Sequence, residues 1–180
     1  MRRSSIVSGT PKYLVGFLVC TALRLVPGRP PNVEPILSTV MPFSKAFGPL
    51  DTAIFAALNM IVFDVITGKV GLWTWITAGT YACVAGGATL FFHLYRFKGA
   101  YVWYAMIGTL FFDFITGVLS GPLLFQQPFM EALLGQIPFT LNHLVSNVVL
   151  ALVVSPLIER WVIQNDALTW DKLVLQRLRS

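Results

Sequence analysis

Apolar segments dominate this sequence, and short stretches rich in proline, glycine and charge separate them. Only 12% of the 180 residues are Asp, Glu, Lys or Arg, about half the share that is usual in a soluble domain. So few charged side chains cannot cover the surface of a water-soluble globule of this length. The composition therefore predicts an all-α membrane protein that folds as one compact helical bundle.

Proline, glycine and charge divide the sequence into about six candidate membrane helices. We expect these helices at residues 13–26, 33–47, 49–66, 73–95, 100–119 and 137–161. Several are shorter than the ~20 residues of a full span, and prolines interrupt the second. Such helices are tolerated in a membrane where they pack on protein or line a cavity. The sequence leaves open whether residues 123–134 form a re-entrant piece before the last helix.

The basic residues predict the orientation of this bundle. With six spans and a cytoplasmic N-terminus, all but three of the 13 Lys and Arg residues fall on the inner side. The three outer residues are Arg24, Arg29 and Lys69. Because the basic residues lie between apolar segments and not on one face, nucleic-acid binding is not expected despite the net charge of +5. We expect a multi-pass protein of a prokaryotic plasma membrane, with both termini in the cytoplasm.

These expectations divide the chain into three parts: a cytoplasmic tail at residues 1–12, a six-helix membrane domain at 13–161 and a second cytoplasmic tail at 162–180. The start of the chain also resembles a signal peptide. We favour a retained first helix, because the rest of the chain is membrane-embedded as well. The second tail mixes charged residues with Leu and Val, which is typical of an amphipathic helix on the inner leaflet. A solvated terminus is the alternative.

A hexapeptide occurs twice, as FDVITG at 63–68 and as FDFITG at 112–117. Each copy closes an apolar segment, so we expect Asp64 and Asp113 at similar depth near the outer face. An ionisable residue within a membrane segment is costly and indicates a functional site. The alternative is a structural tie, because a carboxylate at a helix C-terminus needs a compensating partner. The sequence leaves both interpretations open.

Other polar and aromatic side chains are expected in the same outer half of the bundle. Together with the two aspartates, the candidate substrate-binding residues are Glu34, Trp73, Trp75, Asn142 and His143. An apolar pocket with a few converging polar groups is the usual form of a small-molecule site. Carboxylates combined with Trp suit a cationic or nitrogen-rich ring. Individually, the Trp residues are also explained as interfacial anchors, and the His as a structural residue.

Catalytic and cofactor motifs are missing from the sequence. Without a GxxxxGK[ST] loop, the chain is not expected to hydrolyse ATP by itself. It has no HExxH motif and no Cys cluster for zinc, and Ser120 lacks the preceding Gly of a serine-hydrolase elbow. We therefore expect no enzyme activity and no cofactor. A divalent-metal permease stays as an alternative, with Asp64, Asp113 and His143 as ligands.

Several stretches resemble the substrate-binding S component of energy-coupling factor (ECF) transporters. They are an Arg-containing end to the first helix, PNVEP at 31–35, FGPL at 47–50, GLWTWIT at 71–77 and LNHLVSNVVLALVVSP at 141–156. The resemblance extends over about two thirds of the chain.

This resemblance implies a six-helix bundle that captures a vitamin-like solute from outside. A separate transmembrane T component and a pair of ABC ATPases then drive its delivery. In the family, small residues four apart let helices of the T component approach closely. The corresponding partner-docking residues here are Gly16, Cys20, Ala78, Ala82 and Gly86. The alternative from another class is a structural membrane scaffold without a ligand.

Overall fold

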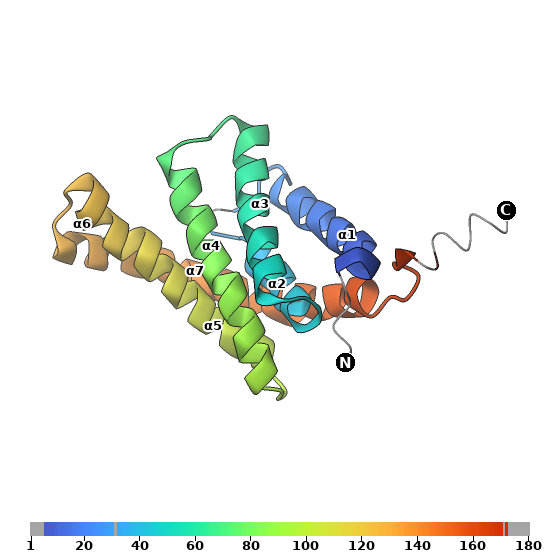
Figure 1. Cartoon of the computed structure of the whole chain (residues 1–180). Coiled ribbons are helices and arrows are strands. Elements are labelled where there is room, and N and C mark those ends of the chain that lie inside the picture. Colours follow the sequence, from blue (N-terminus) through green and yellow to red (C-terminus); the bar gives the residue numbers. More distant parts are fainter. Residues whose placement is uncertain (1–5, 31, 171, 173–180) are drawn as a thin grey trace.

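The computed structural model describes residues 6–30, 32–170 and 172 (Figure 1). Within these ranges every regular element is a helix, which confirms the all-α class. Four helical segments are long and apolar enough to cross a membrane: Pro49–Thr67, Leu72–Leu94, Ala100–Phe125 and Phe129–Ile163. Residues 171 and 173–180 of the predicted C-terminal amphipathic helix lie outside the described residues.

The helices follow one another with short connections. In chain order they are α1 (Ile6–Arg24), α2 (Pro35–Ala46), α3 (Pro49–Thr67), α4 (Leu72–Leu94), α5 (Ala100–Asp113), the π-helical η1 (Phe114–Leu119), α6 (Ser120–Phe125), α7 (Phe129–Ile158) and the π-helical η2 (Glu159–Ile163). The first helix begins seven residues before the expected start at residue 13, within the segment assigned to the N-terminal tail.

The expected break between the fifth and sixth helices differs from the structure. α5, η1 and α6 form one continuous run, Ala100–Phe125, and α7 starts only four residues later. Gln126 makes the turn with a left-handed backbone (φ 56°). Residues 123–134 are therefore not a separate re-entrant piece. They end one long helix, turn, and begin the next.

The short helix α2 occupies the centre of the bundle. Ten of its 12 residues are buried, and it packs against α1, α3, α4, α5 and α7. At 1.5 Å per residue it is about 18 Å long, well short of a ~30 Å hydrocarbon core. Pro35 fits its first turn because no helical acceptor exists for an N–H there. The bundle therefore surrounds a short interior helix with longer ones.

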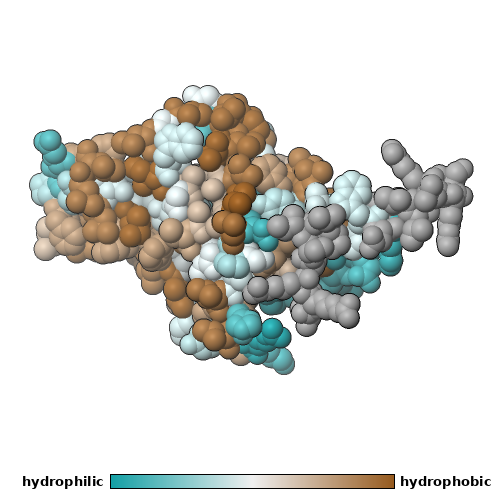
Figure 2. Space-filling model, viewed as in Figure 1, coloured by the Kyte–Doolittle hydropathy of each residue, from teal (hydrophilic) through white to brown (hydrophobic). Residues whose placement is uncertain are grey.

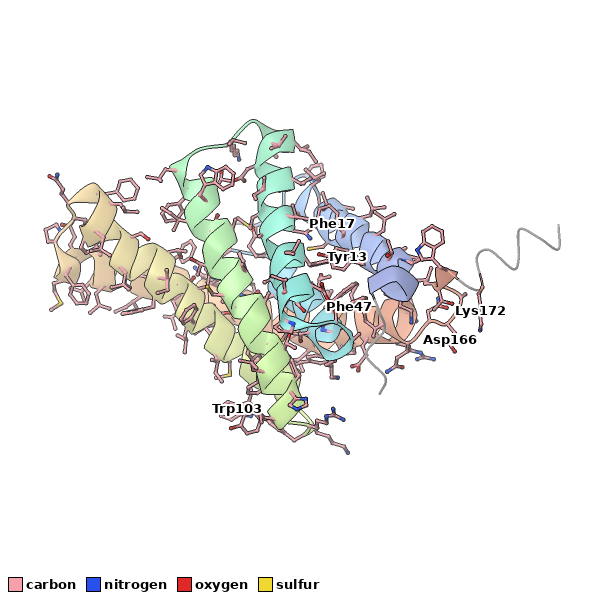
Figure 3. The ribbon with its side chains drawn as sticks, in the orientation of Figure 1. Tyr13, Phe17, Phe47, Trp103, Asp166 and Lys172 are labelled. Atoms are coloured by element: carbon pink, nitrogen blue, oxygen red, sulfur yellow. The ribbon has the colours of Figure 1, made fainter. Side chains whose placement is uncertain are left out.

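Aromatic rings join α1, α2 and α3. Tyr13 meets Phe43, Phe47 and Phe55 edge-on, with centroids 5.1–6.2 Å apart. Figure 3 shows Tyr13 and Phe47 among the side chains between these helices. Gly16 makes the contact possible, because a Cβ there would lie only 2.1 Å from the Phe43 ring.

Adding a methyl group at Gly16 is expected to destabilise the protein. Gly16→Ala forces the Phe43 ring to move within a packed cluster, at a cost of about 1–3 kcal/mol. Gly79→Ala is the matched control, because a Cβ at Gly79 has no atom within 4 Å and only gains helix propensity. Thermal unfolding in detergent should place Gly16→Ala clearly below Gly79→Ala. Equal midpoints would contradict the close contact between α1 and α2.

The surface of the helices is largely apolar. Figure 2 shows hydrophobic residues over the arm formed by α6 and the neighbouring parts of α5 and α7, and over the tip of the α3–α4 hairpin. Leu90, Leu152 and Leu123 are among the large side chains that are at least 60% exposed. Hydrophilic residues gather at the lower tip, where the α4–α5 loop lies, at the far end of the arm and toward the right-hand end. This distribution fits a protein whose sides contact lipid.

Basic residues from several elements lie at the same end of the bundle. Lys12 of α1 donates a hydrogen bond to the carbonyl of Ile163 (2.6 Å). Lys45, near the end of α2, pairs with Glu159 of η2 (2.8 Å). Arg96 in the α4–α5 loop borders the same hollow as that pair. The start of α1 and the ends of α2, α4 and α7 therefore meet on one side.

Candidate ligand-binding site

The two copies of the hexapeptide have different backbone structures. FDVITG ends α3 at Gly68, whose left-handed backbone (φ 68°) caps the helix. FDFITG does not end its helix, because the chain continues through the π-helical turn η1. π-Helical turns are rare and are often found at functional sites. The two aspartates therefore stand in different local settings.

Asp64 is a structural tie between α3 and α4. The buried Thr74 hydroxyl donates to the Asp64 carboxylate (2.6 Å) and accepts a hydrogen bond from the backbone N–H of Gly71 (3.1 Å). The backbone N–H of Lys69 donates to the Asp64 carbonyl (2.8 Å). These bonds fix the turn between the two helices. Of the two interpretations open for Asp64, the contacts match the structural one.

Loss of the Thr74 hydroxyl is expected to weaken the α3–α4 hairpin. Thr74→Val keeps the side-chain shape but leaves a buried Asp64 oxygen without its donor, at a cost of about 1.5–3 kcal/mol. Thr77→Val serves as the control, because the Thr77 hydroxyl bonds only to the backbone of its own helix. Chemical or thermal unfolding in detergent measures the difference. If both variants unfold alike, Asp64 does not depend on Thr74.

Glu34 belongs to a second structural tie, at the C-terminal end of α1. Its two carboxylate oxygens accept hydrogen bonds from Arg24 (3.1 Å) and Arg29 (3.0 Å). The buried Arg24 guanidinium also donates to the Asn59 carbonyl (2.6 Å) and lies 4.0 Å from the centre of the Phe63 ring. Glu34 thus neutralises a buried cation that joins α1, α2 and α3.

Asp113 and His143 form a buried pair between α5 and α7. The Asp113 Oδ1 and His143 Nδ1 atoms are 2.7 Å apart, and both side chains are only 2% exposed. One turn along, Asn147 Nδ2 donates to the Thr109 hydroxyl (2.8 Å). Residues four apart on each helix face the same neighbour. The two contacts are therefore successive polar interactions, one helical turn apart, across the α5–α7 interface.

Four polar atoms of this region have no hydrogen-bond partner among the described residues. They are Asp113 Oδ2, His143 Nε2, Asn147 Oδ1 and the hydroxyl of Tyr81 on α4. The Tyr81 ring lies 4.2 Å from that of Phe112, which in turn meets His143 edge-on at 5.9 Å. A buried polar atom without a partner costs about 1–3 kcal/mol, so most are satisfied. The four atoms belong to α4, α5 and α7.

Two hollows lie along η1 and α7, near the Asp113–His143 pair. A groove of about 590 Å³ runs between the α5–η1 segment and α7, and its lining includes Asp113, Gln136 and Thr140. A smaller pocket of about 230 Å³ lies between the start of α4, η1 and α7. Trp73 and Phe139 line it, and the Phe139 ring is 5.8 Å from His143. Both hollows include Gln136 in their lining, and of the polar pair only Asp113 lines one of them, the groove.

Gly117 in η1 determines how closely this segment approaches α7. A Cβ at Gly117 would lie 2.0 Å from Gln136 Oε1. Glycine therefore allows the Gln136 side chain to lie directly against the π-helical turn. The Gln136 amide in turn donates to the Thr140 hydroxyl, at the longer distance of 3.4 Å. Gln136 and Thr140 thus form a polar pair on the first half of α7.

The structure brings together only part of the predicted site. Asp113 and His143 meet, and Trp73 lines the smaller pocket. Glu34 and Asp64 lie in their separate ties, whereas Asn142 and Trp75 are exposed.

Sequence reasoning left three residues out of the site: Tyr81, Thr109 and Asn147. The sequence does indicate that Asn147 is near the site, because it follows His143 by four residues and shares its helix face. It gives no such indication for Tyr81 and Thr109, because Tyr and Thr within apolar helices are common in ordinary cores.

The expected partner-docking residues are distributed between the interior and the surface. Gly16, Cys20 and Ala78 are buried within the bundle. Ala82 and Gly86 are half-buried on α4, where Gly79 and Cys83 next to them are exposed. Small residues let a neighbouring helix approach closely. A docking face built on these small residues is therefore accessible on α4 and not on α1.

The described residues contain no group of three His, Cys, Asp or Glu side chains placed to hold a metal ion. Because Asp64 is hydrogen-bonded to Thr74, the three-ligand arrangement of Asp64, Asp113 and His143 does not form there. Comparison with known proteins gives no match to a family model, a curated protein or a solved structure.

Proposed function

We propose that the chain is the substrate-capture S component of an ECF-type importer, a six-helix membrane bundle that binds a small vitamin-like solute from outside. The observation that carries the proposal is the set of four buried, unpaired polar atoms between α4, α5 and α7. A scaffold without a ligand gains nothing from such costly groups. A capture protein needs them, because they orient a solute in an otherwise apolar site.

We infer the class of solute from the chemistry of the unpaired atoms. Asp113 Oδ2 and Asn147 Oδ1 only accept hydrogen bonds when Asp113 is ionised, and the Tyr81 hydroxyl either accepts or donates. A solute with several N–H or O–H donors satisfies them, and a positive charge on it matches Asp113. The rings of Phe112 and Phe139 around His143 suit a flat, nitrogen-rich ring.

The location of the basic residues supports a cytoplasmic inner end. Lys12, Lys45 and Arg96 gather where α1 begins and where α2 and α4 end, as the positive-inside rule requires of the cytoplasmic side. At the other ends of α1 and α2, Arg24 and Arg29 both pair with Glu34. We therefore assign both termini to the cytoplasmic side and the Asp113–His143 pair to the part of the bundle away from it.

Delivery of the solute then requires partners, because the chain lacks a phosphate-binding loop. We assign this role to a transmembrane T component and a pair of ABC ATPases, which dock on the small-residue face of α4 around Ala82 and Gly86.

Purification of the tagged protein from its own cells in mild detergent tests this assignment. A second multi-pass protein and two ATPases should accompany it, and Ala82→Leu should reduce their recovery more than Leu90→Ala on the same exposed side of α4. Recovery of a cell-wall or cytoskeletal complex instead would contradict the proposal.

A further inference from the structure

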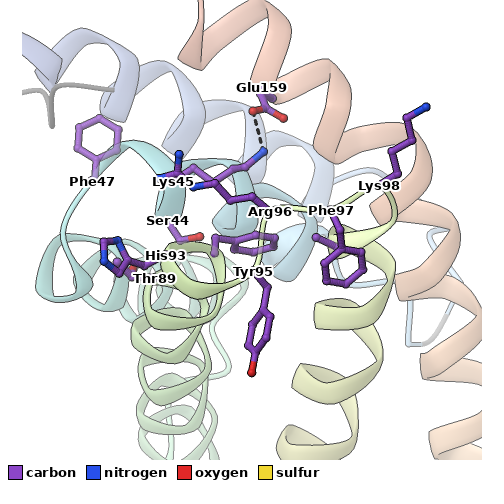
Figure 4. Close-up of a pocket in the computed structure, with 12 residues that line it drawn as sticks. Ser44, Lys45, Phe47, Thr89, His93, Tyr95, Arg96, Phe97, Lys98 and Glu159 are labelled. Atoms are coloured by element: carbon purple, nitrogen blue, oxygen red, sulfur yellow. Dashed lines mark hydrogen bonds and ion pairs between the residues drawn. The ribbon is translucent and has the colours of Figure 1, made fainter.

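A hollow of about 490 Å³ lies at the basic end of the bundle (Figure 4). Its walls come from the end of α2, the end of α4, the α4–α5 loop and the start of η2. It is remote in the fold from the Asp113–His143 pair, since none of the residues around that pair lines it. Its polar lining residues are Ser44, Lys45, Thr89, His93, Tyr95, Arg96, Lys98 and Glu159.

The hollow carries an excess of positive charge. Lys45 is neutralised by Glu159 at 2.8 Å, and the Tyr101 hydroxyl donates to the same carboxylate at 2.6 Å. Figure 4 shows the Lys45–Glu159 pair across the hollow, with His93 and Lys98 on opposite sides of it. Among the residues that the structure describes, no carboxylate pairs with Arg96 or Lys98. Two permanent positive charges are thus left without a counterion.

Exposed apolar and aromatic side chains lie near Arg96 and Lys98. Leu94 is 70% exposed at the end of α4, and Tyr95 and Phe97 are about half exposed in the loop. Trp103, one turn into α5, projects outward near the same tip (Figure 3). Exposed Trp and Tyr next to Arg and Lys are typical of the membrane–water interface.

The position of the hollow relative to the membrane follows from α4 and α5, the helices on either side of its loop. α4 and α5 both belong to segments that are long and apolar enough to cross a membrane, and residues 95–99 form the only connection between them. The loop therefore lies where the hydrocarbon core ends, at the level of the lipid headgroups.

We propose that this hollow binds the phosphate of an anionic phospholipid headgroup. Arg96 supplies a forked donor for the phosphate oxygens, and Lys98 and His93 add donors on either side. The exposed rings of Tyr95, Phe97 and Trp103 lie against the glycerol and the first methylene groups. Basic pockets between membrane helices on the cytoplasmic side are suited to such headgroups. The aromatic rim favours a lipid over free phosphate, which has no apolar part to cover.

Native mass spectrometry of the full-length protein tests this site. The protein is equilibrated with mixed micelles of phosphatidylglycerol and phosphatidylcholine, and the phospholipid that remains bound is counted. The wild type should retain phosphatidylglycerol in preference. Arg96→Gln should reduce this retention about fivefold, and Arg96→Gln with Lys98→Gln about 25-fold. Both side chains are exposed, so the melting temperatures should stay at the wild-type value.

Lys69→Gln provides the matched control, because Lys69 is an exposed cation in the α3–α4 loop. It should leave the retention of phosphatidylglycerol unchanged. Equal retention by the wild type and the double variant would overturn the proposal, as would an equal loss in Lys69→Gln. A competition arm separates the two sources of phosphate. If inorganic phosphate alone displaces the lipid and binds in an Arg96-dependent way, the site is one for free phosphate and the lipid assignment fails.

Discussion

Replacement of Asp113 by Asn is expected to lower the affinity for the captured solute by about 10- to 100-fold, because a hydrogen bond to a charged group is worth about 1.5–3 kcal/mol. The substitution keeps the shape of the side chain and a possible contact to His143, but it removes the negative charge at Oδ2. Isothermal titration with the solute identified from the purified protein measures the effect.

Two further variants sharpen this prediction. Tyr81→Phe removes one hydroxyl, so the affinity should fall less, by about fivefold. Asp51→Asn is the control, because Asp51 lies at the start of α3, where its carboxylate accepts a hydrogen bond from the Gly48 N–H. Wild-type affinity in Asp113→Asn would show that the solute binds elsewhere, even if Asp51→Asn behaves as expected.

The largest effect on stability is expected at the Arg24–Glu34 tie. Glu34→Gln leaves the buried Arg24 guanidinium without its counter-charge, and breaking such a pair costs about 3–5 kcal/mol. For a protein of this size each kcal/mol corresponds to a fall in melting temperature of about 2–4 °C. The midpoint in detergent should therefore fall by roughly 6–20 °C. Binding of solute to the folded fraction should be retained.

The control for this effect is Glu131→Gln, because Glu131 is exposed at the start of α7 and should tolerate the change. A paired substitution separates the lost attraction from the uncompensated charge. Arg24→Met with Glu34→Met removes both partners and should recover most of the lost stability. If the double variant is no more stable than Glu34→Gln, the cost does not come from a stranded buried cation.

The helical class and the approximate location of the helices were predictable from the sequence, because apolar content and breaks at Pro27, Gly68 and Arg96 are local signals. Residues 123–134 were not predictable in the same way. Gly121 and Pro122 indicate an end of the helix, yet α6 continues to Phe125. Pro122 lies within the continuous run, shortly after the π-helical turn η1, and Gly121 allows close contact with Gln127 and Ala132. These contacts are tertiary and leave no periodic pattern.

The candidate site shows the same division between local and tertiary information. Asp113 and His143 stand out in a sequence because each is a costly residue within an apolar segment. Glu34 and Asp64 stand out for the same reason, and the sequence does not reveal that arginines and a threonine satisfy them. Whether a buried polar residue has a partner depends on helix packing. Only the folded arrangement distinguishes Glu34 and Asp64, whose carboxylates have hydrogen-bond partners, from Asp113, which has one oxygen without a partner among the described residues.

The central claim is that the unpaired atoms around Asp113 and His143 bind a small solute. Mass spectrometry of the protein purified in mild detergent, before and after denaturation, tests it most directly. The account predicts that the wild type releases one compound that carries several N–H or O–H donors, and that Asp113→Asn purifies without it. Wild-type protein that folds and carries no small molecule, or an Asp113→Asn variant that carries the same compound in equal amount, would contradict the account.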